Sequence, residues 1–441
     1  MTRVIFSCLT VAVALLAVRS TNAADPPPGY TAIFNGKDLS GWHGMPGTNP
    51  DELDAMSPED RKAKIDEWTK DAAAHWSVQN GELVNDGQGA YLTTDKEFGE
   101  YELLIEYKTV PLADSGIYLK YIPQVQIWDW RKEAGKWDLQ ADRGSGGLWN
   151  NTATRDGKDP LVLADKPFGE WNSFRIRQLG ARTSVWLNGE LVVQHARLEN
   201  FWDPDKEHKK PIRAKGSIEL QTHGGEIRWR NIFVKEFTAD EANELLEAES
   251  GGGFHSLFNG QDLTGWQGVT DSYEVVNGAI RCKDGQGGVL YTNEEYGDFV
   301  VRLQFKLPPA GNNGLAIRYP GGTGDAAYIG MCELQVLDTE HTNYASIDPR
   351  QAHGSVYGMI PAARGYHRPT GEWNFQEVTV KGPTIKVELN GNLIVDGDVS
   401  KVTEFMADTP HPGKDRTSGF FGFAGHTDPV EFRKIAIKRL D

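Results

Sequence analysis

The chain has 441 residues and carries 62 Asp and Glu against 46 Lys and Arg, which gives a formal net charge of -16 at pH 7. This acidic balance excludes nucleic acid as an expected partner, because phosphate binding draws on stripes of Lys and Arg that the sequence lacks. The chain is also longer than one hydrophobic core usually serves, which favours two domains. Its 49 Gly and 13 Trp are typical of a turn-rich β protein with aromatic side chains on exposed faces.

The first 24 residues have the pattern of a secretory signal peptide. Arg3 precedes an apolar run over residues 11–18, and residues 21–23 provide a cleavage site. The apolar run is shorter than the roughly 20 residues that a spanning helix needs, so we expect no membrane anchor. A mature chain that begins at residue 24 or 25 and is periplasmic or secreted is the resulting expectation.

Residues 34–42 recur as residues 258–266 with seven of nine positions identical, which indicates an internal repeat. Shorter matches follow in the same order, among them Gly-Glu-Trp-Asn at 169–172 and 371–374. The long spacing between copies indicates a duplicated whole domain. We expect the first domain over residues 25–237, a linker over 238–253 and the second domain over 254–441.

Strands and turns dominate both copies. Asn-Gly pairs supply tight β-turns, and apolar residues such as Val301, Leu303 and Phe305 alternate with polar ones, so each strand buries one face. The fold class is therefore all-β, with two packed antiparallel sheets in each copy. Two helices are expected outside the sheets: an insertion near residues 57–74 of the first copy, and a linker helix that follows the capping box Thr238–Glu241 and ends before the glycines at 251–253.

The strand over residues 331–338 is the first candidate for a site. Its alternation places Cys332, Leu334 and Val336 toward the core and Glu333 and Gln335 on the opposite face, with Cα atoms roughly 6.6 Å apart. One sugar ring bridges such a distance. Asp338 has the wrong parity for this face and joins it only if the strand bends or bulges after Val336.

The two copies differ at this strand. The first copy has Gln124 in place of Glu333, while Gln126 and Asp129 match Gln335 and Asp338. An amide cannot act as a base, so the second copy is the better candidate for chemistry. The second copy also has further groups that could transfer a proton or hold an oxyanion: Arg318, where the first copy has Lys120, and His353 and Tyr357. Near the last strands, His426 of the second copy aligns with His223 of the first.

Other interpretations of these residues stay open. A strand carboxylate near an Arg is most often a surface ion pair worth under about 1 kcal/mol, and His353 alone is equally typical of a loop. Phosphate-loop, dinucleotide and zinc-protease motifs are missing from the sequence, so no cofactor is required. A divalent cation such as calcium stays open, because acids such as Asp338 and Asp348 are present but lack a fixed ligand spacing. Cys282 and Cys332 allow at most one disulfide, and the sequence decides neither this bond nor the oligomeric state.

In both halves, the ordered set Phe-Asn-Gly-x-Asp-Leu-x-Gly-Trp, Gln-x-x-Asp, Gly-Glu-Trp-Asn and Leu-Asn-Gly resembles the 3-keto-disaccharide hydrolase domain family, formerly domain of unknown function 1080. The resemblance implies two tandem concanavalin-like jelly-roll sandwiches with ligand over the concave sheet, and activity on glycosides oxidised at C3. The central Glu-x-Gln-x-x-Asp motif of the family carries onto Glu333, Gln335 and Asp338, but in the first copy only onto Gln126 and Asp129. The closing Arg-Asn-Ile is complete only in the first copy, at 230–232, so a site between the halves stays open.

A ketone at C3 acidifies the proton on C2, so one base can remove that proton and expel the C1 substituent, and water adds later. The hypothesis gives Glu333 or Asp338 the role of base and Arg318 or His353 the role of oxyanion donor, while Gln335 orients the saccharide. Further substrate contacts are expected from Tyr357, His426, Gln126, Asp129 and His223. Two alternatives remain: an ordinary glycoside hydrolase with two carboxylates, and a non-catalytic carbohydrate-binding protein that uses Trp128, Trp149 or Tyr357.

Overall fold

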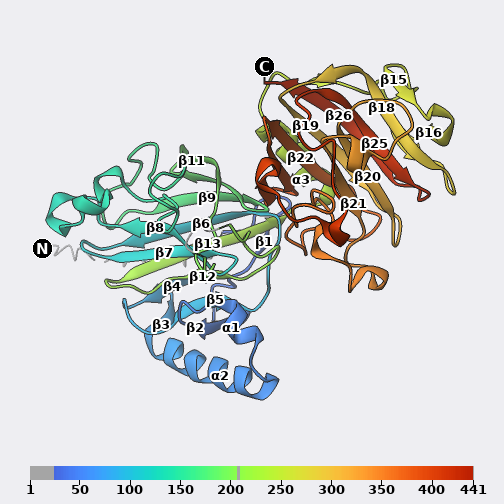
Figure 1. The fold of residues 1–441 in the computed structure, drawn as a ribbon. Helices are drawn as coiled ribbons and strands as arrows, with labels where there is room; N and C mark the ends of the chain where they lie inside the picture. The colour runs from blue at the N-terminus through green and yellow to red at the C-terminus, as the bar shows by residue number, and fades with distance from the viewer. Residues whose placement is uncertain (1–23, 206–208, 441) are drawn as a thin grey trace, which may run out of the picture.

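The computed structural model describes residues 24–205 and 209–440, so the predicted signal peptide over 1–24 lies almost wholly outside the described residues. The described chain forms four antiparallel sheets, two in each half, and each pair packs as a jelly-roll β-sandwich (Figure 1). This confirms the all-β prediction. None of the helices in the described residues has the length and apolar character that crossing a membrane requires.

The first half pairs an eight-stranded sheet with a five-stranded one. The larger sheet runs β11-β10-β9-β6-β13-β4-β3 with β1 beside β13. Its strands are β1 (Thr31–Ala32), β3 (Trp76–Gln79), β4 (Glu82–Asn85), β6 (Tyr101–Thr109), β9 (Asn172–Leu179), β10 (Arg182–Leu187), β11 (Glu190–Arg197) and β13 (Ile227–Glu236). The smaller sheet has the order β2 (Trp42–Met45), β5 (Tyr91–Thr94), β12 (Ile218–Leu220), β7 (Asp114–Leu119) and β8 (Ile122–Trp128).

The second half repeats this arrangement. Its larger sheet runs β16-β17-β26-β19-β22-β23-β24 with β14 beside β26. These strands are β14 (His255–Ser256), β16 (Tyr273–Val276), β17 (Ala279–Cys282), β19 (Phe299–Lys306), β22 (Asn374–Lys381), β23 (Thr384–Leu389), β24 (Asn392–Asp398) and β26 (Glu431–Arg439). The smaller sheet has the order β15 (Trp266–Gly268), β18 (Gly287–Tyr296), β25 (Gly419–His426), β20 (Asn312–Tyr319) and β21 (Cys332–Leu337).

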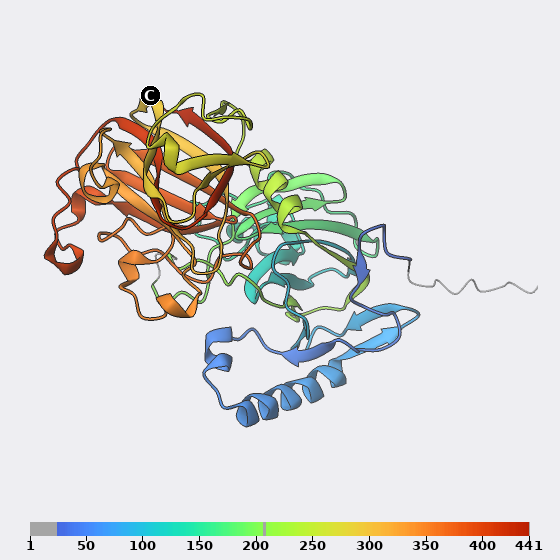
Figure 2. The ribbon, with the colours of Figure 1, turned by 90° about the vertical axis from the view of Figure 1, so that its right-hand side faces the viewer.

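Both predicted helices are present, and each begins at the predicted cap. Helix α2 (Pro58–His75) begins after Ser57, whose hydroxyl accepts from the N–H of Asp60. It connects the edge strands β2 and β3 of the two sheets and closes the sandwich between them (Figure 2). Helix α3 (Ala239–Glu249) begins with the capping box of Thr238 and Glu241. Two short helices were not predicted: α1 (Pro50–Asp54) and α4 (Ala326–Ile329).

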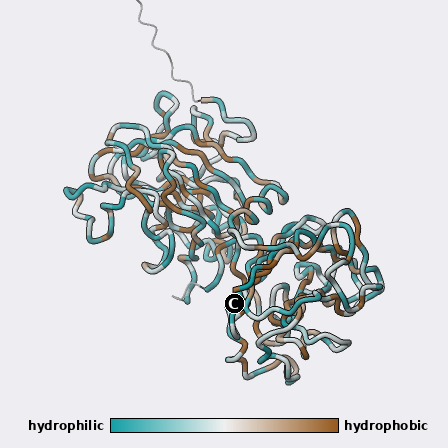
Figure 3. Tube along the Cα trace, turned by 90° about the horizontal axis from the view of Figure 1, so that it is seen from above, coloured by the Kyte–Doolittle hydropathy of each residue, from teal (hydrophilic) through white to brown (hydrophobic). Residues whose placement is uncertain are grey.

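Each sandwich has its own apolar core, visible as hydrophobic segments in the interior of each half (Figure 3). Val301, Leu303 and Phe305 are buried in the second core, as their alternation predicted. Cys282 and Cys332 are also buried there, and both are free thiols. The second fold therefore depends on packing and not on a disulfide.

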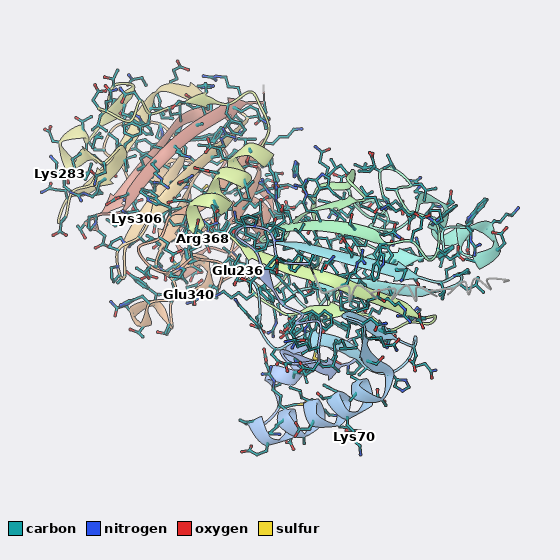
Figure 4. All side chains as sticks on the ribbon, turned by 180° about the vertical axis from the view of Figure 1, so that it is seen from behind. Lys70, Glu236, Lys283, Lys306, Glu340 and Arg368 are labelled. Carbon is teal, nitrogen blue, oxygen red and sulfur yellow. The ribbon has the colours of Figure 1, made fainter. Side chains whose placement is uncertain are left out.

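The two halves share a polar and apolar junction. Helix α3 brings Ala242 and Leu246 against Leu179 of the first half and Phe375 of the second. Beside this cluster, the guanidinium of Arg368 forms a bidentate ion pair with Glu100 at 2.8 and 3.1 Å, at the place where the two halves meet (Figure 4). The duplicated domains are thus joined by a partly buried ion pair as well as by the linker.

Candidate active site

A cavity of about 230 Å³ opens on the outer face of the five-stranded sheet in the second half. Its walls come from β20, β21 and β25, from α4, and from the chain that follows β21. The lining residues are Asn312, Asp325, Ala327, Tyr328, Glu333, Gln335, Leu337, Tyr344, Ile347, Gln351, Tyr357 and His426. All of them belong to the second half, so this cavity is not a site between the two domains.

The alternation of β21 has the predicted orientation. Cys332, Leu334 and Val336 lie in the apolar core, while Glu333 and Gln335 line the cavity. Strand β20 presents small residues opposite them, because Ala316 pairs with Glu333 and Gly314 pairs with Gln335. A Cβ atom on Gly314 would lie 2.1 Å from Oε1 of Glu333, so the absent side chain is what makes room for the carboxylate.

Glu333 is paired with His426 at the bottom of the cavity. Nε2 of His426, at the end of β25, lies 3.3 Å from Oε1 of Glu333, whose side chain is 3% exposed. Burial raises the pKa of Glu333, and the hydrogen bond to His426 opposes this increase. The same hydrogen bond raises the pKa of His426. The pair therefore holds a proton at the cavity floor within reach of a bound ligand.

An amide pair lies beside the carboxylate. Nε2 of Gln335 donates to Oδ1 of Asn312 at 2.6 Å, which fixes both side chains. The second amide atom of each residue, Oε1 of Gln335 and Nδ2 of Asn312, has no recorded partner among the described residues. One acceptor and one donor are thus available for the hydroxyl groups of a sugar.

The chain after β21 forms the far wall. The N–H of Gln335 donates to the carbonyl of Ser355 and the N–H of Tyr357 to that of Glu333, so residues 354–357 run beside the edge strand. This pairing places Tyr357 at the cavity, where its hydroxyl oxygen accepts from Nε2 of Gln351 at 3.4 Å. The hydroxyl proton of Tyr357 then remains available as a donor.

Several lining residues were missed by the sequence analysis. Asp325 lies in the loop before α4 and accepts from the N–H of Ala327 at 3.0 Å, while Tyr328 belongs to the helix itself. Tyr344 and Gln351 lie in the irregular chain beyond β21. Of these residues, only Asn312 could have been predicted from the strand pattern, because it lies on the same face of β20 as Gly314 and Ala316.

The predicted catalytic role of Arg318 is corrected by its position. Its guanidinium donates to the carbonyls of Gly297, Gly382 and Arg416, each at 2.9 Å, and pairs with Asp298. Lys120 occupies the same place in the first half and donates to the carbonyl of Gly180, in the turn that corresponds to that of Gly382. Both residues tie the smaller sheet to the larger one, and Arg318 does not line the cavity.

His353 also lies away from the cavity, inside the sandwich. Its ring stacks on Phe305, Nδ1 accepts from the N–H of Leu337 at 3.3 Å, and Nε2 lies 2.8 Å from Oε1 of Gln376. Burial lowers the pKa of His353 well below its usual value. Both ring nitrogens are paired within the protein and His353 does not line the cavity, so its predicted role as oxyanion donor is corrected as well.

Asp338 and Asp129 have one structural role in the two halves. Oδ2 of Asp338 accepts from the N–H of Ala310, and Oδ2 of Asp129 accepts from the N–H of Leu112, both at 2.9 Å. Ala310 and Leu112 have positive φ angles of 57° and 66°, so each carboxylate fastens a strained turn. Neither Asp338 as base nor Asp129 as substrate contact is supported, and Glu333 is the remaining candidate base.

The matching face of the first half is occupied by its own side chains. Gln124 donates to Gln126, and Gln126 donates to Asp114 at 2.8 Å. Lys136 and His223 both pair with Asp114, the latter at 3.3 Å. The predicted contacts Gln126 and His223 therefore come together around Asp114, and both amide atoms of Gln126 are paired within the protein.

One buried acid does lie on this face of the first half. Glu219 of β12 accepts from the hydroxyl of Thr93 at 3.3 Å, and burial raises its pKa well above the usual value. Glu219 lies opposite Tyr118 on the neighbouring strand. At the corresponding positions the second half has Gly422 opposite Ala316. The larger side chains of the first half fill the space that the second half leaves open.

No group of three or more His, Cys, Asp or Glu side chains suited to a metal ion occurs in the described ranges. Asp348, one of the acids considered for calcium, forms a bidentate pair with Arg350 at 2.8 and 2.9 Å.

The chain is similar to several known proteins. The chain is 25% identical over 249 residues to a 3-keto-disaccharide hydrolase of Bacteroides thetaiotaomicron, a match that covers 47% of this chain and 86% of the relative. A solved structure described as a candidate glycosyl hydrolase of Parabacteroides distasonis is 25% identical, with 43% of this chain and 100% of that chain covered and a TM-score of 0.39. A carbohydrate-binding module, CBM66 of Bacillus subtilis, is 12% identical over 40% of this chain and 95% of its own, with a TM-score of 0.27.

A sequence profile of one family matches both halves separately, over residues 29–235 and 253–438. The two matched ranges together cover most of the chain and correspond to the two sandwiches. This protein therefore belongs to the family of 3-keto-alpha-glucoside-1,2-lyase-like domains, which it contains in two tandem copies.

Proposed function

We propose that the second half cleaves glycosides that carry a ketone at C3, with Glu333 as the base that removes the C2 proton. Family membership and the curated relative support a carbohydrate-active function. The observation that carries the finer proposal is the single buried carboxylate of Glu333, which lies in a sugar-sized cavity and is paired with His426.

The chemistry requires one base. The C3 ketone acidifies the neighbouring C2–H, and the carboxylate of Glu333 takes that proton while the electrons form an enolate. The enolate collapses to a C1–C2 double bond as the C1–O bond breaks and the leaving group takes a proton. Water then adds across the double bond, which returns the C1 hydroxyl and restores the C2 hydrogen.

The remaining roles go to lining residues. With Arg318 and His353 placed elsewhere, the hydroxyl of Tyr357 is the donor we assign to the enolate oxygen, because its proton is not committed to a protein acceptor. His426 holds a proton beside the base and supplies the acid for the departing group. Gln335 and Asn312 orient the sugar ring through their unpaired amide atoms.

A decisive experiment compares Glu333→Gln with Glu219→Gln. Each variant neutralises one buried acid on the outer face of a five-stranded sheet, but only Glu333 lines the cavity. Turnover of a 3-keto-glucoside should fall about 10²–10⁴-fold in Glu333→Gln and stay near the wild-type value in Glu219→Gln. Full activity of Glu333→Gln would remove this residue from the mechanism.

One observation favours a second function, ordinary glycoside hydrolysis. Asp325 brings a second carboxylate to the same cavity, and hydrolases of unoxidised glycosides use two. Cleavage of an unmodified disaccharide at a rate comparable to that of its 3-keto form would favour this alternative. Loss of cleavage when the ketone is reduced to the alcohol supports the elimination route.

The proposal includes export to the periplasm or the medium. It rests on the signal-like sequence of residues 1–24, which precedes the sandwich domains. N-terminal sequencing of the protein recovered from the extracytoplasmic fraction should find residue 24 or 25 first.

A further inference from the structure

We propose that the cavity discriminates by charge, accepting neutral and cationic sugar rings and rejecting those that carry a carboxylate, and that Asp325 sets this selection. The inference rests on the proposed function of the cavity as a site for saccharides. It narrows the substrate class to glycosides of uncharged or amino-substituted sugars and excludes uronides.

The wall of the cavity carries negative charge without a free cation. Asp325 and Glu333 both line it, and no Lys or Arg does so among the residues that the structure describes. The one basic lining group, His426, lies 3.3 Å from Glu333, so its charge is balanced by that acid. A carboxylate on a bound sugar would therefore find repulsion and no counter-ion.

The basic residues nearest in the chain are also engaged. Arg318 donates to three carbonyls and Asp298 beneath the sheet, and Arg350 forms a bidentate pair with Asp348. Asp428 adds another acid behind the amide pair, where it accepts from the N–H of Asn312 at 2.9 Å. None of these cations is available to neutralise an anionic ligand.

Asp325 is held in place by the turn that it begins. Its Oδ1 accepts from the N–H of Ala327. Nδ1 of His411 lies 2.7 Å from the carbonyl oxygen of Ala327 and holds the same turn. Burial raises the pKa of Glu333 and the hydrogen bond to Glu333 raises that of His426, and the charge of Asp325 adds a smaller contribution in the same direction to each pKa. An acid whose charge reaches these two groups acts in the same way on a ligand bound beside them.

The first half offers a contrast at the matching place. There Lys136 pairs with Asp114, and the ammonium of Lys158 lies 3.5 Å from the ring centre of Trp149. The duplicated fold therefore tolerates lysines on this face, whereas the cavity of the second half has none. Charge selection is a property of its particular residues and not of the sandwich.

The test uses three 3-keto substrates with the same leaving group: a glucoside, a glucuronide and a 6-amino-6-deoxyglucoside. In the wild-type protein we expect kcat/KM for the glucuronide to be about tenfold or more below that of the glucoside, and the amino sugar to equal or exceed the glucoside. In Asp325→Asn the glucuronide-to-glucoside ratio should rise about tenfold. Asn caps a helix as well as Asp does, so the fold is retained.

The matched control is Asp86→Asn in the first half, an exposed acid that pairs with His75 at 3.0 Å and does not line the cavity. This variant changes the net charge equally and should leave the ratio unchanged. A wild-type ratio near one, or a ratio that Asp325→Asn does not alter, overturns the inference. Absence of turnover on all three substrates overturns the proposed function instead. In that case calorimetry of the unoxidised glucoside, glucuronide and amino sugar decides the inference: weaker binding of the glucuronide by a similar factor supports it, and equal binding refutes it.

Discussion

The carboxylate of Glu333 lies across Gly314 of the neighbouring strand, so closely that a methyl group on Gly314 would come within 2.1 Å of Oε1. The glycine is not needed for backbone conformation, because its φ angle is not positive. It serves the carboxylate, whose position over the sheet depends on the missing side chain.

Gly314→Ala should therefore fold normally and lose activity. The clash falls on Cγ, Cδ and Oε1 of Glu333, so this side chain must rotate away, and the displaced carboxylate no longer reaches the substrate. We expect kcat/KM on a 3-keto-glucoside to fall about 10²-fold or more, because small misplacements of a catalytic group are costly. The matched control is Gly116→Ala in the first half, where the nearest atom of Gln124 would lie 3.0 Å away and activity should persist.

The pairing of His426 with Glu333 predicts a shift in the pH profile. The hydrogen bond from His426 lowers the pKa of Glu333 against the effect of burial, so removing it lets that pKa rise further. The base form is the ionised carboxylate, and the acidic limb of kcat/KM should move to higher pH in His426→Gln. His223→Gln in the first half is the control. An acidic limb that stays in place or moves to lower pH would contradict the assignment of Glu333 as base.

The ionised carboxylate of Glu333 should also lower the free energy of unfolding at neutral pH. Its pKa in the folded state is raised by burial above the unfolded value of about 4.3, so the folded state binds the proton more tightly. The contribution of Glu333 to the free energy of unfolding is therefore full at a pH below its pKa in the unfolded chain. It is lost as the pH rises through its pKa in the folded protein.

Glu333→Gln removes this cost, and the variant should unfold at the same or a higher temperature than the wild type at pH 7. The difference should shrink toward pH 4, where both side chains are neutral. Thermal unfolding across this pH range checks the expectation. A variant that is less stable than the wild type at pH 7 would show that the charged form is favoured by its surroundings.

Local patterns predicted the sandwiches, the helices α2 and α3, and the outward direction of Glu333 and Gln335. These features follow from rules of short range: the alternation of a strand, the cap of a helix and the residues of a tight turn. Because the chain contains two copies of the same pattern, the fold predicted for one copy applied to the other as well.

The remaining members of the site were outside the reach of such rules. Asp325 and Tyr344 lie in irregular segments, and their approach to β21 depends on how the chain folds back. Arg318 and His353 were predicted as site residues because their side chains can hold an oxyanion or transfer a proton. The structure buries both with partners distant in sequence. The match of Arg318 with Lys120 was the one available hint of a shared structural role.

That shared role gives the last prediction, for Arg318→Lys and Arg318→Met. Arg318 satisfies three buried carbonyls and Asp298, while Lys120 satisfies a single recorded carbonyl with the same position in the fold. Lysine should keep one of these bonds and lower the free energy of unfolding by about 1–3 kcal/mol. Methionine, which leaves the three carbonyls without this donor and Asp298 with only the N–H of Gly382, should lower it by about 3–5 kcal/mol. Because the guanidinium lies outside the cavity, the folded fraction of Arg318→Lys should keep kcat and KM near the wild-type values. Denaturant unfolding combined with assays of the folded protein separates the two effects, and a loss of kcat without a loss of stability would return Arg318 to the catalytic site.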